Sequence, residues 1–592
     1  MQMTIGASVF FAISTLALCT GFLAIKKSEN KIHIASWLPA TIIGLMGYHT
    51  MIAAIINLLS IPINIISIGV ANLVAAIICW VIVIKKKQYQ KYTIEWIDIC
   101  VWLLLIYIVA KFAYIKYGPN LFLNFNSIDA SVHLNSAMYV VNAQKVNTMF
   151  FSALNNGLFI ELLGPFVSRT AYFKVFTLAE LCYLFLAGAM FFGVVRKYCK
   201  DTFLKIAGCF ATVAYVSAYP LSSTQYGFSY LGLCITVIAF VIFITDEYAC
   251  GEINKTINII LLSLGCVGVF QAYVLFMPVV YFSVLFCVLM KQHLDKKLFS
   301  VNTIITGLGI FLLPTAIGLW YTYRGIFATG GSGDSGKPTV SSQIALEGGI
   351  YADLFSNFVM IAPLALFALW MFIKNKENKH LAFLLPLDIL FVLVLFILAL
   401  DRKVSAYYFY KNYYMLWLLV CAMAFIGVSY LDKQSRIITV FGALISVALI
   451  MMARSNYDTR IQDKNPLLHP RTQMISYADI YIYNRDLLYI PKYSTDKVEL
   501  YRYIIEELYE KNVTQEDIYI ISDYLDQYWY EAIIGRYLPK YTADEVVEKV
   551  DNGELEYLLI LKYNPGHDQY GGYLDKYERI YETPAGYILK LE

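Results

Sequence analysis

Two residues that could carry out acid–base chemistry, Asp129 and His133, lie four positions apart in the segment IDASVH. In a helix, residues four apart project from one face, with Cβ atoms about 6 Å from each other. A carboxylate and an imidazole in this arrangement could take a proton from a hydroxyl group and orient that group. The alternative is an acid in the first helical turn that favours the helix dipole, beside a solvated histidine.

A second segment, residues 401–414, places cations beside tyrosines between two apolar runs. Guanidinium and ammonium groups could hold a phosphate, while tyrosine rings could line a groove for a sugar and a lipid. The same composition also suits an aromatic belt at a membrane interface, where long cationic side chains reach the headgroups. The candidate binding residues are Arg402, Lys403, Lys411, Tyr408 and Tyr410, with Arg324 as a further phosphate ligand and Glu161 as a further acid.

The composition places these residues in an integral membrane protein. Hydrophobic residues make up 59% of the 592 residues and charged residues only 15%, which is more apolar surface than a soluble protein can bury. A lipid bilayer is therefore an expected partner. The net charge of +3 is too small to indicate a nucleic-acid partner.

Apolar runs long enough to cross a bilayer, about 20 residues each, recur along the chain. The region 256–290 is an unbroken apolar run, and we expect two short helices there with a bend near Gln271 and Pro278. The expected spans, about fourteen, are 4–25, 34–58, 62–84, 97–115, 171–195, 203–221, 228–245, 256–270, 271–290, 301–323, 354–373, 381–400, 413–431 and 437–453.

Lysine and arginine residues set the expected orientation. With the amino terminus outside, seven successive inside loops all carry positive charge, as the positive-inside rule requires. This regularity holds only if 256–290 crosses the membrane twice. We therefore expect a multi-pass protein of the cell membrane with its amino terminus and carboxy-terminal domain extracytoplasmic. Its large outer loops are 116–170 and 324–353.

The chain divides into a transmembrane domain, 1–453, and an extracytoplasmic soluble domain, 454–592, because apolar runs shorten and charged residues become frequent after Met452. The expected fold class is an all-α polytopic membrane domain followed by a small α/β domain. Hydrophobic periodicity in this second domain predicts helices at 497–511 and 525–538, strands at 517–522 and 556–563, and a hairpin at 578–592.

Asp129 and His133 belong to the first large outer loop, which follows an expected span directly. Ser127 suits the N-cap of a helix, and apolar residues then recur at helical spacing. The pattern predicts an amphipathic helix lying along the membrane surface, with Asp129 in its first turn.

This arrangement resembles the GT-C superfamily of glycosyltransferases, membrane enzymes that use polyprenyl-phosphate sugars and include protein O-mannosyltransferases and arabinosyltransferases. The resemblance lies in a span leading to a long outer loop with an acid near its start, many further spans, and an outer carboxy-terminal domain. In some bacterial members a histidine follows the acid four residues later, as in IDASVH here. The resemblance implies a GT-C-like fold in which Asp129 is the general base that acts on the acceptor.

The sequence departs from the superfamily pattern in two respects. The acid follows the fourth expected span rather than the first, so three helices would be an amino-terminal addition. The second acid of the frequent Asp-Glu or Asp-x-Asp pair is missing, because Ala130 and Ser131 follow Asp129. We therefore expect neither a metal ion nor another cofactor.

The expected function is transfer of a sugar from a polyprenyl-phosphate donor to a glycan, glycolipid or protein acceptor outside a bacterial cell. Nucleotide sugars are made in the cytoplasm, so an outward-facing site needs a donor delivered through the bilayer. A flippase or transporter for lipid-linked saccharides also suits about fourteen spans, although such proteins often have paired halves with interrupted helices. A polysaccharide polymerase is the third possibility, and it would be expected to use outer-loop arginines, which are sparse here.

Overall fold

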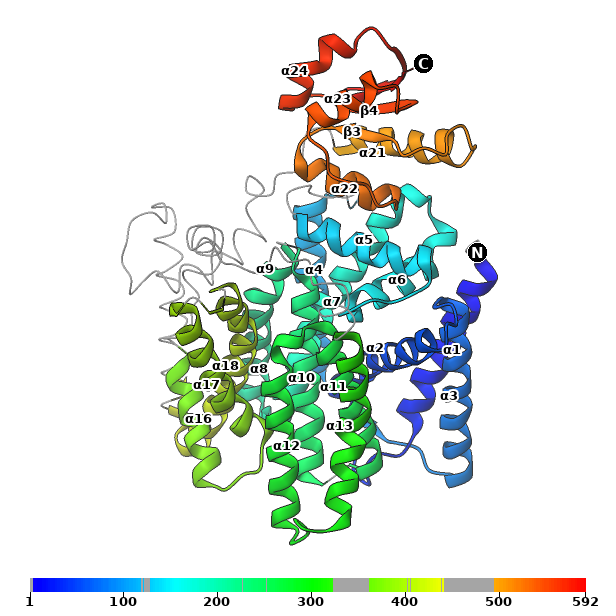
Figure 1. The fold of residues 1–592 in the computed structure, drawn as a ribbon. Coiled ribbons are helices and arrows are strands. Elements are labelled where there is room, and N and C mark those ends of the chain that lie inside the picture. Colours follow the sequence, from blue (N-terminus) through cyan, green and yellow to red (C-terminus); the bar gives the residue numbers. More distant parts are fainter. Residues whose placement is uncertain are drawn as a thin grey trace.

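The computed structural model describes residues 4–118, 121, 128–225, 227–251, 253–322, 361–401, 403–404, 406–437, 439–440 and 494–591. Figure 1 shows a bundle of long helices with a smaller domain stacked on one end, called here the domain end. Among the described residues, twelve helices are long and apolar enough to cross a membrane. The expected fold class, a helical polytopic domain followed by a small α/β domain, is confirmed.

The expected spans correspond closely to the helices of the bundle. The twelve candidate spans and the shorter α16 match thirteen of them, while the fourteenth, 437–453, lies almost wholly outside the described residues. The bundle helices are α1 (Ile5–Ala24), α2 (Ile34–Leu58), α3 (Ile65–Lys86), α4 (Trp96–Tyr117), α7 (Tyr172–Val195), α8 (Thr202–Val216), α10 (Ser229–Cys250), α11 (Lys255–Ala272), α12 (Met277–Leu294), α13 (Val301–Thr322), α16 (Ala362–Lys374), α17 (His380–Leu400) and α18 (Ala406–Gln434). Three further helices, α5 (Ile128–Ala143), α6 (Phe151–Leu163) and α9 (Tyr219–Gln225), belong to connecting segments.

The long apolar run 256–290 forms two helices, as expected. The chain turns at Tyr273, whose backbone is extended, and a short 3₁₀ turn over Val274–Phe276 leads into α12. Pro278 lies in the first turn of α12, where a missing amide hydrogen costs nothing because that group has no intrahelical partner.

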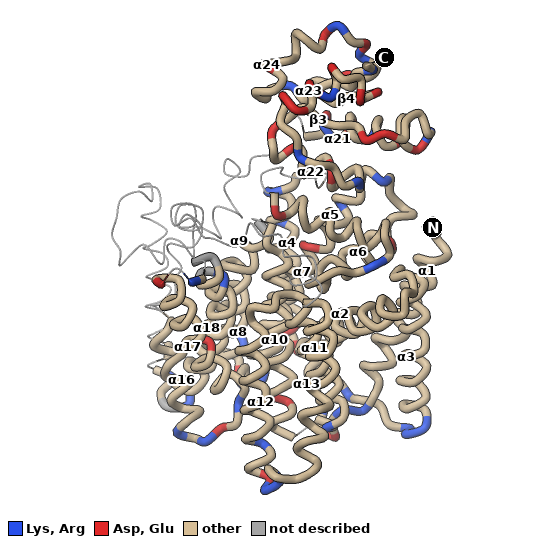
Figure 2. The backbone as a smooth tube through the Cα atoms, in the orientation of Figure 1, with Lys and Arg blue, Asp and Glu red and all other residues tan. Residues whose placement is uncertain are grey.

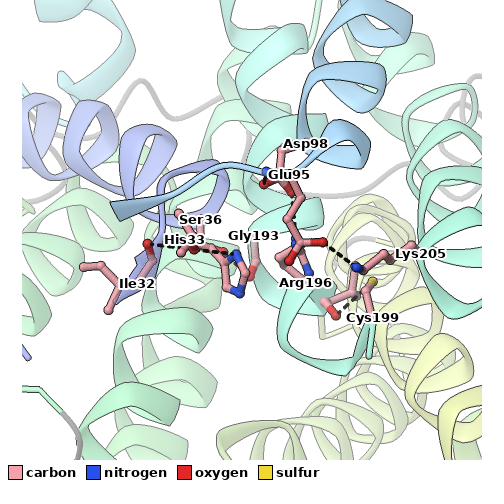
Figure 3. A network of polar contacts seen from close by, with 11 residues as sticks. Ile32, His33, Ser36, Glu95, Asp98, Gly193, Arg196, Cys199 and Lys205 are labelled. Carbon is pink, nitrogen blue, oxygen red and sulfur yellow. Dashed lines mark hydrogen bonds and ion pairs between the residues drawn. The ribbon is translucent and has the colours of Figure 1, made fainter. Parts of the chain in front are cut away.

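Charged residues mark the two ends of the bundle differently. Within the bundle, lysine and arginine gather at the end farthest from the carboxy-terminal domain, called here the lysine end (Figure 2). A buried network ties three helices together there (Figure 3): Arg196 forms ion pairs with Asp98 at 2.7 Å and with Glu95 at 2.9 Å, and Lys205 pairs with Glu95. Asp98 also accepts a hydrogen bond from the Glu95 amide, which caps α4. The network fixes α4 against α7 and α8.

The carboxy-terminal domain is built around a four-stranded sheet in the order β3-β4-β6-β5, with β3 parallel to β4 and the other pairs antiparallel. Side chains alternate between two cores. From β4, Leu558 and Ile560 face one core, while Leu559 and Leu561 face the other. The strands are β3 (Tyr519–Ile521), β4 (Tyr557–Leu561), β5 (Glu578–Thr583) and β6 (Gly586–Lys590), and the helices are α21 (Ser494–Tyr503), α22 (Tyr524–Ile534), α23 (Ala543–Asp551) and α24 (Pro565–Leu574).

One of these two cores continues into the membrane domain. It contains Leu134 and Met138 of α5 and Phe173 of α7 together with residues of α21 and α22. The amphipathic helix expected at the membrane surface is therefore α5, but its apolar side is covered by protein. Periodicity identifies an apolar face, and it does not say whether lipid or protein covers that face.

Polar contacts fix the same junction. Asn135 donates a hydrogen bond to Glu531 at 2.6 Å, and Asn142 donates one to the carbonyl of Gly535 at 3.1 Å. Arg169, just before α7, donates to the carbonyl of Ile534 at 3.1 Å. The end of α22 is thus held between α5 and the start of α7, so the carboxy-terminal domain helps to position α5.

Replacing Gly535 with alanine should loosen this junction. Gly535 has a φ of +69°, and an added Cβ would lie 3.2 Å from Asn142 and 3.3 Å from Arg169. Gly553 is the matched control, because its φ is +68° but nothing lies within 4 Å of its Cβ position. Both changes incur a left-handed backbone cost of about 1–2 kcal/mol. Only Gly535→Ala should speed amide hydrogen exchange in residues 128–143, and equal exchange in the two variants would contradict the docking role.

Candidate active site at the domain end of the bundle

The helix α5 carries the two residues with acid–base potential. Asp129 lies in its first turn and His133 one turn later, so both lie on one side of the helix. The α5 residues that contact α22, namely Asn135, Met138 and Asn142, lie on the opposite side of the helix. Each residue turns a helix by about 100°, which places these three about half a turn away from Asp129 and His133. One face of α5 is therefore held by the carboxy-terminal domain, and the other is directed at the bundle.

Lys411 of α18 meets that second face through Tyr230 of α10. The Lys411 side chain is fully buried, and its ammonium group donates a hydrogen bond to the Tyr230 hydroxyl. The Tyr230 ring packs against the His133 imidazole, with ring centroids 4.2 Å apart. Asp129, His133, Tyr230 and Lys411 are called here the acid–lysine cluster. Its members come from three helices that are far apart in the sequence.

Three aromatic rings surround the ammonium group of Lys411. Its Nζ lies 4.8 Å from the ring centroid of Phe228, 5.0 Å from that of Tyr230 and 5.2 Å from that of Tyr273. The negative faces of aromatic rings attract cations and can contribute about 2 kcal/mol when the site is desolvated. The rings therefore support a positive charge that burial alone would disfavour.

The cluster perturbs the titration of both α5 residues. Asp129 is an exposed residue, yet neighbouring protein removes enough water from its carboxyl group to raise its pKa, and the positive charge of Lys411 opposes that rise. Loss of water lowers the pKa of His133 to about 4, and Lys411 contributes to the lowering. At neutral pH the His133 imidazole is therefore neutral, and it lies beside the carboxyl group of Asp129 and the side chain of Lys411.

A second polar group adjoins the cluster. Ser229, the neighbour of Tyr230, donates a hydrogen bond to the buried carboxylate of Glu180 on α7. Lys116, at the end of α4, donates to the carbonyl of Thr224 at 3.2 Å and acts electrostatically on Glu180. Because α10 begins at Ser229, its positive dipole end lies at the cluster. The start of α10 therefore contributes partial positive charge beside Lys411, while Lys116 lies near the acid Glu180.

The remaining predicted binding residues are Lys403, Tyr408, Tyr410, Arg402 and Arg324. Lys403 is exposed and forms an ion pair with Asp401 at 2.7 Å. Tyr408 is exposed near the start of α18, and Tyr410 precedes Lys411 in the same helix, although its side chain is outside the described part. Arg402 and Arg324 lie outside the described residues. Their expected contacts with a donor remain predictions.

Glu161 lies at a contact between two helices, α6 and α3. It is buried in α6, where its carboxylate accepts a hydrogen bond from the amide of Ile65 at 2.7 Å, at the first residue of α3. Carboxylates favour helix N-termini, since amide hydrogens there have no intrahelical partner. Burial nevertheless raises the pKa of Glu161 to about 7. This contact joins α6 to α3.

No group of three or more histidine, cysteine, aspartate or glutamate side chains in the described segments could hold a metal ion. His133 packs against the Tyr230 ring, and Lys411 acts electrostatically on both Asp129 and His133; neither group is a typical metal ligand. Metal independence remains a prediction.

The sequence offers the segment 222–232 either as a source of hydroxyls for a sugar or as a polar turn between helices, but it does not single out Tyr230, Phe228 or Tyr273 as members of the site. Tyr230 and Phe228 lie in the segment 222–232, between two spans at the domain end, and Tyr273 lies at the bend between α11 and α12. Their positions at span boundaries were visible in the sequence. Their convergence on Lys411 was not, because nothing in the sequence specifies which helices are neighbours.

Replacing Glu161 with glutamine tests its structural role. Because its folded-state pKa is about 7, above an ordinary 4.5, the folded protein holds this proton more tightly than the unfolded chain. Stability should therefore fall as pH rises from 4.5 to 7. Glu161→Gln cannot ionise, so its melting temperature should exceed that of the wild type at about pH 8 and match it at about pH 5. Exposed Glu29→Gln is the control, and an unchanged pH profile for Glu161→Gln would contradict the assignment.

Comparisons with known proteins place the chain in no family. No protein-family model matches it, and no curated protein matches it. Among solved structures, it is similar to the oligosaccharyltransferase of Archaeoglobus fulgidus in its apo form, with 11% identity and a TM-score of 0.36. The match covers 74% of this chain and 64% of that one, so it spans less than two thirds of the archaeal enzyme. Identity and TM-score are both too low for this likeness to assign a fold or a function.

Proposed function

We propose that this protein is an integral membrane glycosyltransferase that moves a sugar from a polyprenyl-phosphate carrier to an acceptor hydroxyl at the extracytoplasmic face. The observation that carries the proposal is the convergence of Asp129 and Lys411 in one cluster at the domain end. A base and a buried cation are the two groups that such a transfer requires, one for the acceptor and one for the leaving phosphate. The resemblance to the GT-C superfamily adds to this support.

The proposed reaction is a single displacement. Asp129 accepts the proton of the acceptor hydroxyl while the hydroxyl oxygen forms a bond to the anomeric carbon. The bond between that carbon and the phosphate oxygen breaks, and the carrier phosphate leaves with the bonding electron pair. Attack opposite the leaving group inverts the anomeric configuration. Neutral His133, beside the base, is suited to orient the acceptor through a hydrogen bond.

The leaving phosphate gains negative charge and needs positive potential where it departs. In this proposal Lys411 supplies an ammonium group, and the start of α10 supplies the positive end of a helix dipole. Because Lys411 is fully buried, a phosphate would reach its ammonium group only by displacing the hydroxyl of Tyr230 as its hydrogen-bond partner. The aromatic rings would continue to exclude water from the ammonium group.

The proposed orientation places the domain end outside the cell. The lysine end satisfies the positive-inside rule when it faces the cytoplasm (Figure 2). The chain begins at the domain end (Figure 1), where the Ser8 hydroxyl donates to the Glu161 carbonyl at 3.4 Å. The amino terminus and the carboxy-terminal domain would then both be extracytoplasmic, and the acceptor would be a glycan, glycolipid or protein there.

Replacing Asp129 with asparagine should lower kcat by about 10²–10⁴-fold, because the amide cannot accept the proton. The measurement is transfer of a radiolabelled sugar from a polyprenyl phosphate in membranes containing the variant. Asp568→Asn, an exposed acid of the carboxy-terminal domain, is the control and should keep wild-type activity. Wild-type kcat for a well-folded Asp129→Asn protein would assign the base elsewhere.

The pH dependence of transfer separates the roles of Asp129 and Lys411. Transfer requires ionised Asp129, so kcat/KM should rise with pH through an apparent pKa above 3.8. Lys411 lowers the pKa of Asp129, so Lys411→Met should shift this limb to higher pH and raise KM for the donor. Lys145→Gln, at an exposed lysine just after α5, should change neither the position of this limb nor the KM for the donor. An unmoved acid limb in Lys411→Met would contradict the electrostatic coupling.

A further inference from the structure

A cavity of about 430 Å³ lies in the half of the bundle nearer the lysine end, apart from the acid–lysine cluster. Its walls come from α1, α3 and α11, and α2 forms its floor. All four helices are candidate membrane spans. The lining is largely aliphatic, with Leu18, Ile82, Leu45, Ile257 and Leu264 as examples. A volume of this size is within the range of ligand-binding pockets, about 300–1,000 Å³.

The cavity exists because the amino-terminal helices are packed unevenly. Helix α1 packs along α3, and the Trp80 indole donates a hydrogen bond to the carbonyl of Ala17 at 3.1 Å. Helix α2 instead packs on α11, where a Cβ at Gly47 would lie 2.7 Å from the carbonyl oxygen of Leu264. The pair α1 and α3 therefore stands away from α11, and a space remains between them.

This space opens sideways toward the surroundings of the bundle. Two of its lining residues, Ile78 of α3 and Ile260 of α11, are 56% and 52% exposed. At the lysine end, the chain partly closes it, because the amide of Asn254 donates to the carbonyl of Lys27 at 2.8 Å. In a membrane, a sideways opening between two spans faces acyl chains rather than water. An apolar cavity with such an opening suits a hydrocarbon chain.

Two lysines at the lysine end of the cavity could bind the phosphate of a lipid headgroup. Lys26, just after α1, and Lys86, in the last turn of α3, both line it (Figure 2 shows this end). The described partner of Lys26 is Glu29, whose side chain is 87% exposed, and exposed ion pairs contribute little to stability. A phosphate could therefore exchange with that carboxylate at small cost. The neighbouring polar residues Asn254 and Thr256 could bond to glycerol or phosphate oxygens.

We propose that this cavity binds one acyl chain of an anionic phospholipid from the cytoplasmic leaflet, with the lipid phosphate held by Lys26 and Lys86. The site does not depend on the proposed transferase activity, but its placement in the cytoplasmic leaflet rests on the proposed orientation. A lipid chain in this cavity would fill the space between α3 and α11 and so support the pair α1 and α3 against the rest of the bundle.

The test is native mass spectrometry of the full chain in mild detergent, with added phosphatidylglycerol or phosphatidylcholine. Wild-type protein should retain one phosphatidylglycerol per chain and hold it at least about fivefold more strongly than phosphatidylcholine. Leu45→Trp, which fills the cavity, should reduce retention of both lipids at least about fivefold. Lys26→Glu with Lys86→Glu should abolish the preference for the anionic headgroup while leaving acyl-chain binding.

The matched control is Lys85→Glu with Lys91→Glu, which changes the same net charge at the lysine end but does not alter the cavity lining. This variant should keep the phosphatidylglycerol preference, and thermal unfolding should verify that all variants fold. Equal retention by Leu45→Trp and the wild type would overturn the site. If the control variant also lost its preference for phosphatidylglycerol, general surface charge would explain that preference, and the proposed site would again be overturned. Preferential binding of a polyprenyl phosphate at this site would also overturn the assignment of the occupant.

Discussion

The buried ammonium group of Lys411 is the constraint around which the domain end of the bundle is organised. A buried charge needs partners that replace water, and this one has the hydroxyl of Tyr230 and three aromatic rings. These partners require α10 to begin near α18 and require the chain to bend at Tyr273 between α11 and α12. The bend divides an apolar run into two spans, and it also places the Tyr273 ring beside the ammonium group of Lys411.

The helix α5 connects this cation to the carboxy-terminal domain. Its side bearing Asp129 and His133 is directed at Tyr230 and Lys411, and its opposite side is bound to α22. A rigid helix transmits displacement from one face to the other, so a shift of α22 would move the acid relative to the lysine. The domain thus has a positional role even though its own sheet lies away from the cluster. That role accounts for a shared hydrophobic core across the junction.

The membrane spans could be predicted from the sequence because the bilayer imposes a length and an apolar composition on each of them. Asp129 and Lys411 could be proposed as site candidates for the related reason that charges near the outer ends of spans are few. Tyr230 could not be identified, since a tyrosine at a span boundary is common and its contacts depend on helix packing. Helices α23 and α24 were missed because they are short and polar. The hydrogen bond from the Ile65 amide to Glu161 could not be foreseen, because the two residues are distant in sequence.

The energetics of the cluster are consistent with the function proposed for it. A buried charge is a poor means of stabilising a fold, because an apolar residue of similar volume commonly serves as well or better. Charges within a membrane also cost about 2.5–3.5 kcal/mol at its centre, with smaller costs toward the interface. Lys411 is nevertheless buried, and its charge opposes the rise that desolvation causes in the pKa of Asp129. Desolvation raises the pKa of the Asp129 carboxyl group and Lys411 lowers it, and in the proposed mechanism these two opposing effects set the pH range in which the group can act as a general base.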